Sequence, residues 1–119
     1  MEVTSITIGI PVGNLEKASQ WYERCLELEG HIEPASDIRE YQVFPGCWLQ
    51  LSEAGTTKSQ NCLLLGVADL DPERQRLKYL GIEVGEINRV EGVISWFDFQ
   101  DPDGNNLSLY RVEQAEATP

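Results

Sequence analysis

The chain has 119 residues, 41% of them hydrophobic, and a formal net charge of −11 because 20 acidic side chains outnumber 9 basic ones. This length predicts one domain with a single core, and the composition is that of a globular protein and not of a disordered one. The negative charge repels phosphate backbones, which excludes nucleic acid as an expected partner.

The cysteines and the first residues indicate the compartment. Cys25, Cys47 and Cys62 are odd in number and widely spaced, so they predict neither a disulfide framework nor a metal-binding pair. The N-terminal stretch lacks the basic segment of a secretory signal, and no apolar run reaches the length of a membrane span. We therefore expect a cytoplasmic protein with reduced thiols and no membrane partner.

The first half of the chain predicts a strand, a helix and three further strands. Alternating apolar residues indicate a strand over 5–12. Asn14 can cap the following helix through its side-chain oxygen, and an apolar stripe at helical spacing continues to an expected stop at Gly30. Extended segments are expected at 31–34, 39–44 and 47–52.

The second half repeats this order after a polar stretch at 53–61. The expected elements are a strand over 62–67, a helix capped by Asp69 or Asp71 and ended by Gly81, a short strand over 82–87, and a hairpin over 92–112. One such unit cannot bury both its helix and its sheet, whereas two units can. We therefore expect a single domain of two modules, approximately 1–55 and 60–112, with a C-terminal tail at 113–119.

The hairpin is the best-specified local structure. Its turn at 101–104 contains a proline that presets φ and a glycine that supplies a positive φ. Alternation divides its side chains between two faces. The side chains expected to face the core are Phe97, Phe99, Leu107 and Leu109, and those on the opposite face are Trp96, Asp98, Ser108 and Tyr110.

The repeated order of elements, the opening segment VGNLEKASQWYERCLEL and the closing segment DPDGNNLSLY resemble the vicinal oxygen chelate superfamily of glyoxalase, bleomycin-resistance and dioxygenase-like proteins. The resemblance implies an α+β fold. In that fold two βαβββ modules form a curved mixed sheet, with the helices on its convex side and a small-molecule cleft on its concave side. It also implies a homodimer.

Metal-dependent members of this superfamily carry four ligands, which are His, Glu or Gln, on the first and last strands of each module. The positions that match in this chain are Thr7, Gln50, Cys62 and Ser108. None of them is His, Glu or Asp, and hydroxyl groups are poor ligands for divalent ions without carboxylate or imidazole partners. We therefore expect no metal and no other cofactor in the cleft.

Alternation places these four side chains on one sheet face together with Trp48, Trp96 and Tyr110. An apolar cleft with a few polar groups is typical of a small-ligand site, although such a face can also be simply solvated or buried in a dimer. Asp98 has the same parity and is a candidate for binding a cationic ligand. The candidate ligand-binding residues are Thr7, Trp48, Gln50, Cys62, Trp96, Asp98, Ser108 and Tyr110.

Other candidates have simpler explanations. His31 follows the first helix and is expected to be a surface histidine away from the cleft, not a general base. Cys62 is expected to be a buried, inert thiol because no base can be placed beside it, and Cys25 is expected in the core. Asp101 and Asp103 resemble the start of a calcium loop, but the spacing lacks its glycine and distal glutamate and predicts turn chemistry instead.

Three functions remain open. The first is a metal-free binding protein, similar to the bleomycin-resistance branch, for a small aromatic, amphipathic or cationic molecule. The second is a metal-dependent lyase or dioxygenase, with ligands drawn from His31, Glu40, Glu53 or Asp98 and unknown catalytic residues. The third is a dimeric interaction module whose aromatic residues are buried by a protein partner.

Overall fold

The computed structural model describes residues 1–53 and 62–113. The chain divides into two compact units, Met1–Ser59 (unit 1) and Gln60–Pro119 (unit 2). The described strands form two four-stranded mixed sheets, one in each unit, and each unit contains one helix. The expected α+β class and the βαβββ order of each half are confirmed. Most of the expected boundary stretch and tail lie outside the described residues.

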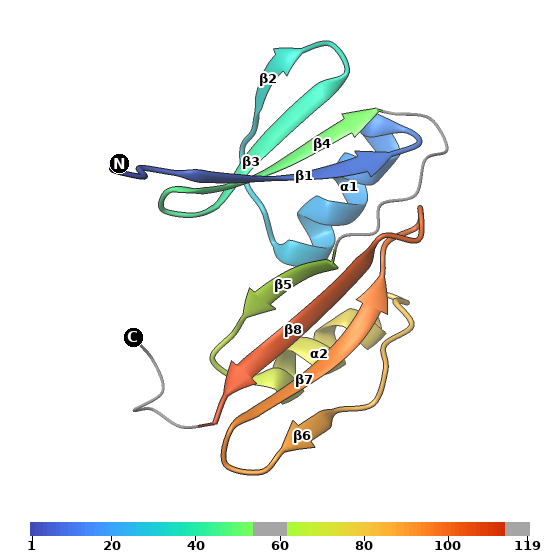
Figure 1. Cartoon of the computed structure of the whole chain (residues 1–119). Coiled ribbons are helices and arrows are strands. Elements are labelled where there is room, and N and C mark those ends of the chain that lie inside the picture. Colours follow the sequence, from blue (N-terminus) through green and yellow to red (C-terminus); the bar gives the residue numbers. More distant parts are fainter. Residues whose placement is uncertain (54–61, 114–119) are drawn as a thin grey trace. The chain divides into compact units, whose positions relative to one another are not determined.

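Unit 1 follows the order strand, helix and three strands (Figure 1). Its elements are β1 (Ile6–Val12), α1 (Leu15–Leu26), β2 (Ile32–Ala35), β3 (Ile38–Phe44) and β4 (Cys47–Glu53). The strand order is β1-β4-β3-β2, with β1 parallel to β4 and the other neighbours antiparallel. The helix α1 is the crossover that a parallel pair requires.

The helix α1 begins at the expected cap and ends earlier than expected. The Asn14 side chain accepts a hydrogen bond from the Lys17 amide at 2.9 Å, and the Glu53 carboxylate accepts one from the Leu15 amide at 3.1 Å. These bonds satisfy two of the free N–H groups of the first turn. The predicted stop at Gly30 is wrong, because Glu27 already adopts a left-handed φ of 54° and its amide closes onto the Glu23 carbonyl.

One face of the unit 1 sheet is covered by the apolar stripe of α1. The buried side chains of this core are Ile10, Val12, Leu15, Ala18, Tyr22, Cys25, Tyr41, Leu49 and Leu51. Cys25 therefore lies in the core, as the sequence predicts. Because side chains alternate along a strand, the residues between the buried ones point to the other face of the sheet.

Unit 2 repeats the plan. Its elements are β5 (Cys62–Gly66), α2 (Leu70–Tyr79), β6 (Asn88–Val90), β7 (Ile94–Gln100) and β8 (Asn106–Val112), with the strand order β5-β8-β7-β6 and β5 parallel to β8. Its buried apolar residues are Leu63, Leu70, Leu77, Phe97, Phe99, Leu107 and Leu109. Within the described residues of both units, no helix has the length and apolar character needed to cross a membrane.

The second strand of unit 2 lies later in the chain than expected. Residues 82–87 form only an isolated bridge between Val84 and Phe99, and the paired strand is β6. Gly85 lies close to the β7 backbone, since its amide donates to the Asp98 carbonyl at 2.8 Å and an added Cβ would lie 3.2 Å from that oxygen. A glycine and charged neighbours have low strand propensity, which explains why the ladder does not extend here.

The turn between β7 and β8 is built on one buried carboxylate. Asp101 Oδ1 accepts hydrogen bonds from the amides of Asp103 and Asn105 at 2.9 and 2.8 Å, and its Oδ2 accepts one from Asn105 Nδ2 at 2.8 Å. Gly104, with φ 84°, closes the turn by donating to the Asp101 carbonyl. The carboxylate organises the turn by hydrogen bonding, as the turn prediction requires.

Candidate functional site

The strand register groups the candidate residues of unit 1 on the sheet face turned away from α1, here called far face 1. Cα pairing places Thr7 beside Trp48, Gly9 beside Gln50, and Gln50 beside Glu40. Thr7 is exposed, whereas Trp48 and Gln50 are half-buried. The structure therefore brings together the three unit 1 candidates on one face.

Far face 1 contains a hydrogen bond that sequence reasoning missed. The Gln50 Nε2 atom donates to the Glu40 carboxylate at 2.7 Å, across the β3–β4 pair. Because Glu40 precedes the apolar residue Tyr41 on one strand, alternation indicates that Glu40 points away from the core. Its partner depends on the cross-strand register, which the sequence does not give directly.

The sheet face of unit 2 turned away from α2, here called far face 2, holds the other candidates. Trp96 pairs with Tyr110 and Asp98 pairs with Ser108, all on this face, and Cys62 occupies the first position of β5 with the same parity. Leu64, which sequence reasoning did not select, lies on the same face of β5 two residues after Cys62, and it is 60% exposed. The five unit 2 candidates are therefore also on one face.

The ring of Tyr110 lies directly over Gly66. A Cβ at Gly66 would come within 3.0 Å of the ring carbon Cζ, so only glycine allows this close approach. Ser108 is buried at 3% exposure, and its Oγ donates to the Phe97 carbonyl at 3.2 Å. Its hydroxyl proton is thus engaged, and towards a ligand it can act only as an acceptor.

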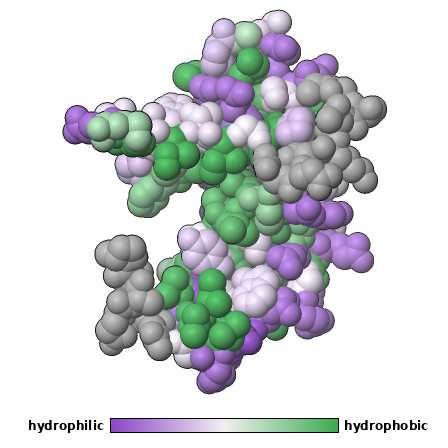
Figure 2. All heavy atoms as spheres, in the orientation of Figure 1, coloured by the Kyte–Doolittle hydropathy of each residue, from purple (hydrophilic) through white to green (hydrophobic). Residues whose placement is uncertain are grey.

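Apolar side chains are also exposed. The large ones with more than half of their surface accessible include Val3, Ile6, Ile32, Phe44, Leu64 and Val93. Figure 2 shows apolar residues at several places on the surface of each unit, with polar residues among them. Such exposure is compatible with binding of an apolar group, but scattered single residues require no special explanation.

No protein-family model matches the chain, and no curated protein matches it. Solved structures do. The glyoxalase/bleomycin resistance protein of Catenulispora acidiphila matches with a TM-score of 0.77 and 23% identity, over 91% of this chain and 97% of that one. The fosfomycin resistance protein FosX of Listeria monocytogenes matches with a TM-score of 0.80 and 22% identity, over 98% of both chains.

A third similar structure is that of TnmS3, an antibiotic-binding protein from Streptomyces sp. CB03234. It has a TM-score of 0.74 and 26% identity, over 94% of this chain and 96% of that one. The glyoxalase/bleomycin resistance protein and FosX belong to the superfamily that the sequence resembles. The chain has the vicinal oxygen chelate fold.

On the vicinal oxygen chelate fold, the four positions that the resemblance matches to metal ligands hold no carboxylate and no imidazole. Thr7 and Gln50 lie on far face 1, and Cys62 and Ser108 lie on far face 2. Among residues 1–53 and 62–113, no group of three or more His, Cys, Asp or Glu side chains is arranged so that it could hold a metal ion. This donor set does not fit a divalent ion, for which carboxylate or imidazole groups are the usual ligands.

The prediction that Cys62 is buried is wrong, because the residue is exposed at the start of β5. The alternation of side chains correctly predicted on which side of the sheet Cys62 lies. A side chain at the end of a strand has fewer neighbours to bury it, and alternation does not show this. Partial desolvation of the sulfur raises the pKa of the Cys62 thiol, and the negative charge of Asp98 raises it further. The thiol is therefore a weak nucleophile despite its exposure.

Alkylation of Cys62 by iodoacetamide is expected to be slower at about pH 8 than that of an unperturbed cysteine, because a raised pKa leaves a smaller thiolate fraction. Asp98→Asn removes the negative charge, so it should lower this pKa and accelerate the reaction. Mass spectrometry of the native protein gives both rates, with buried Cys25 as the unreactive reference. Equal rates in the two proteins would contradict the assigned electrostatic cause.

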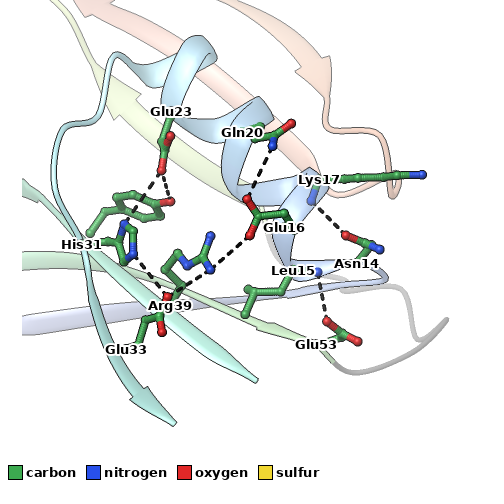
Figure 3. A network of polar contacts seen from close by, with 11 residues as sticks. Asn14, Leu15, Glu16, Lys17, Gln20, Glu23, His31, Glu33, Arg39 and Glu53 are labelled. Carbon is green, nitrogen blue, oxygen red and sulfur yellow. Dashed lines mark hydrogen bonds and ion pairs between the residues drawn. The ribbon is translucent and has the colours of Figure 1, made fainter. Parts of the chain in front are cut away.

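His31 lies on the α1 side of unit 1, as expected for a residue away from the candidate site. Figure 3 shows it between two carboxylates, with Nε2 3.3 Å from Glu33 and Nδ1 4.0 Å from Glu23. Tyr41 donates to Glu23 at 2.6 Å, and burial together with this bond raises the pKa of Tyr41. Arg39 joins the same network through Glu33. These contacts tie α1 to β2 and β3.

Proposed function

We propose that the protein binds a small aromatic or amphipathic molecule without a metal ion, and sequesters it instead of transforming it. The observation that carries the proposal is the cross-strand pair of Trp96 and Tyr110 on far face 2, beside exposed Leu64. Both rings are half-buried, which leaves part of each available for contact. Large flat side chains held in this way suit stacking against an aromatic ligand.

The orientation of Tyr110 supports the proposal. Its ring is seated on Gly66, where a side chain would displace it, and its strand is paired on both sides. A ring that is already fixed loses little conformational entropy on binding. Far face 1 offers a further indole, Trp48, next to the polar groups of Gln50 and Thr7. The proposed ligand contacts are Thr7, Trp48, Gln50, Cys62, Trp96, Asp98, Ser108 and Tyr110.

The similar structures and the donor chemistry agree with this proposal. TnmS3 is described as an antibiotic-binding protein, and the Catenulispora protein bears the name of a bleomycin resistance protein. We extend the proposal to an organic ligand of antibiotic-like chemistry. The absence of His, Asp and Glu at the four matching positions favours binding without a metal. We also propose that the protein is a cytoplasmic homodimer. Light scattering coupled to size-exclusion chromatography measures its oligomeric state.

A thermal-shift screen in chelator-treated buffer tests the proposed function. The library consists of aromatic and amphipathic small molecules, including antibiotics, and each hit is repeated after addition of zinc, nickel or manganese. We expect stabilisation by a subset of compounds, with no dependence on added metal. Failure of every compound to stabilise the protein, or a stoichiometric divalent ion in the purified protein, would contradict the proposal.

Trp96→Ala is expected to weaken binding of a hit compound by about 30-fold, the effect of losing an aromatic anchor worth about 2 kcal/mol. Gly66→Ala should also weaken binding, because it displaces the Tyr110 ring without removing it. Tyr79→Ala is the matched control, since Tyr79 is an aromatic residue of α2 that is 92% exposed. Isothermal titration calorimetry measures all three, and an effect of Tyr79→Ala as large as that of Trp96→Ala would refute the assignment.

A further inference from the structure

The basic side chains of the sheets all point away from the two far faces. The arginines of the described strands are Arg39, Arg89 and Arg111. Arg39 pairs with Leu51, and Arg89 and Arg111 both pair with Ser95, which lies between them. Leu51 and Ser95 are buried on the core side of their sheets, so the three arginines lie on that side too. No lysine lies in a described strand. Each far face instead carries one carboxylate on its strands, Glu40 in unit 1 and Asp98 in unit 2. The strands therefore place one negative charge and no positive charge on each far face.

Glu40 differs from two other half-buried carboxylates of the described chain, Glu73 and Glu113, which have arginine partners. The Glu113 side chain, 18% exposed, lies 3.7 Å from Arg89 and 3.5 Å from Arg111. Glu73, 34% exposed, pairs with Arg76 at 3.0 Å. Glu40 is half-buried on far face 1 and forms no ion pair with the described residues.

The one hydrogen bond that the Glu40 side chain makes with described residues orients its charge without neutralising it. Gln50 donates to one carboxylate oxygen, Oε2, at 2.7 Å from the neighbouring strand. An amide donor fixes the group but carries no positive charge. A partly buried carboxylate without a counter-charge is destabilised relative to one with a cation beside it. The negative charge of Glu40 is therefore available to a positively charged group.

An aromatic residue, Trp48, lies on the same sheet face as Glu40. Trp48 lies two residues before Gln50 on β4 and points to the same face. It is therefore a diagonal cross-strand neighbour of Glu40, which pairs with Gln50. Diagonal neighbours on one sheet face are within reach of a large ring. A carboxylate beside an indole is the combination that recognises an organic cation, by charge attraction and by attraction to the ring face.

We infer that the ligand carries a protonated amine or a related organic cation, and that Glu40 binds this group beside Trp48. The inference rests on the proposed function, which it narrows from aromatic molecules in general to cationic ones. Glu40 makes the ionic contact, and Gln50 holds its carboxylate in place. Neutral molecules of the same shape lack the group that Glu40 binds.

Tryptamine and tryptophol test the inference, since they share an indole and differ in an ammonium group against a hydroxyl group. We expect the wild-type protein to bind tryptamine at least about tenfold more tightly, with the preference weakening as salt is added. Glu40→Gln should abolish the preference by weakening tryptamine binding alone. Glu29→Gln is the control, because it removes the same charge from an exposed side chain after α1.

The possible outcomes separate the inference from the function on which it rests. Equal binding of both probes, unchanged by Glu40→Gln, would overturn the inference and leave small-molecule binding intact. Loss of the preference in Asp98→Asn with no effect of Glu40→Gln would also overturn it, because the cation would then be bound in unit 2. Absence of binding by both probes and by every library compound would contradict the proposed function itself. Circular dichroism confirms that each variant is folded.

Discussion

Replacing Phe97 with alanine is expected to destabilise unit 2 by about 3–5 kcal/mol. Phe97 is fully buried, its ring centroid lies 5.9 Å from that of Phe99, and it pairs across strands with Leu109. The substitution leaves a cavity in a core whose other buried apolar side chains are leucines and Phe99. Since domains are stable by only about 5–15 kcal/mol, this loss removes a large share of the free energy of unfolding.

Hydrogen exchange of the β7 and β8 amides measures this effect within unit 2, and urea unfolding measures it for the whole chain. The control is Phe44→Ala, because Phe44 is 67% exposed and its truncation should change stability by no more than about 0.5 kcal/mol. Similar losses in the two variants would show that Phe97 does not have the role in the core that its burial indicates.

Asp101→Ala is expected to cost about 2–4 kcal/mol, because the turn between β7 and β8 depends on three hydrogen bonds to this one side chain. Two backbone amides and the Asn105 side chain would lose their acceptor in a buried place. Urea unfolding gives the loss of stability, and exchange of the Asn105 amide reports the turn directly.

Asp101→Asn provides a graded comparison. The amide oxygen of asparagine can keep both backbone bonds of Oδ1, whereas its amino group would face Asn105 Nδ2 and lose the third bond. We expect a loss between zero and that of Asp101→Ala. A loss from Asp101→Asn equal to that of the alanine variant would show that charge, and not hydrogen-bond geometry, holds the turn.

The order of elements and the faces of the strands were predictable because each depends on neighbours in sequence. Alternation in β4 and β7 placed Trp48 and Trp96 on the correct face, and an asparagine before an apolar stripe predicted the cap of α1. The carboxylate that begins the turn at Asp101 was predictable for the same reason. Local sequence patterns determine whether a segment is a helix or a strand, which face of a strand a side chain lies on, and which residue caps a helix.

The incorrect predictions depended on features that local patterns do not encode. The end of α1 is set by the backbone of Glu27, a residue with no preference for the left-handed region, while Gly30 was the better candidate by residue type. The exposure of Cys62 depends on how far its neighbours cover the end of β5. The bond from Gln50 to Glu40 depends on the register of two strands, and this is why Glu40 was considered only as an alternative metal ligand.

In each sheet the last strand in sequence is one of the two interior strands. β4 lies between β1 and β3, and β8 lies between β5 and β7, so the first strand of either unit has no partner until the final strand is added. A nascent chain that stops before β4 therefore exposes an unpaired strand and cannot complete its core. During synthesis each half should fold in one late step, after its last strand has left the ribosome, and not gradually from its N-terminus.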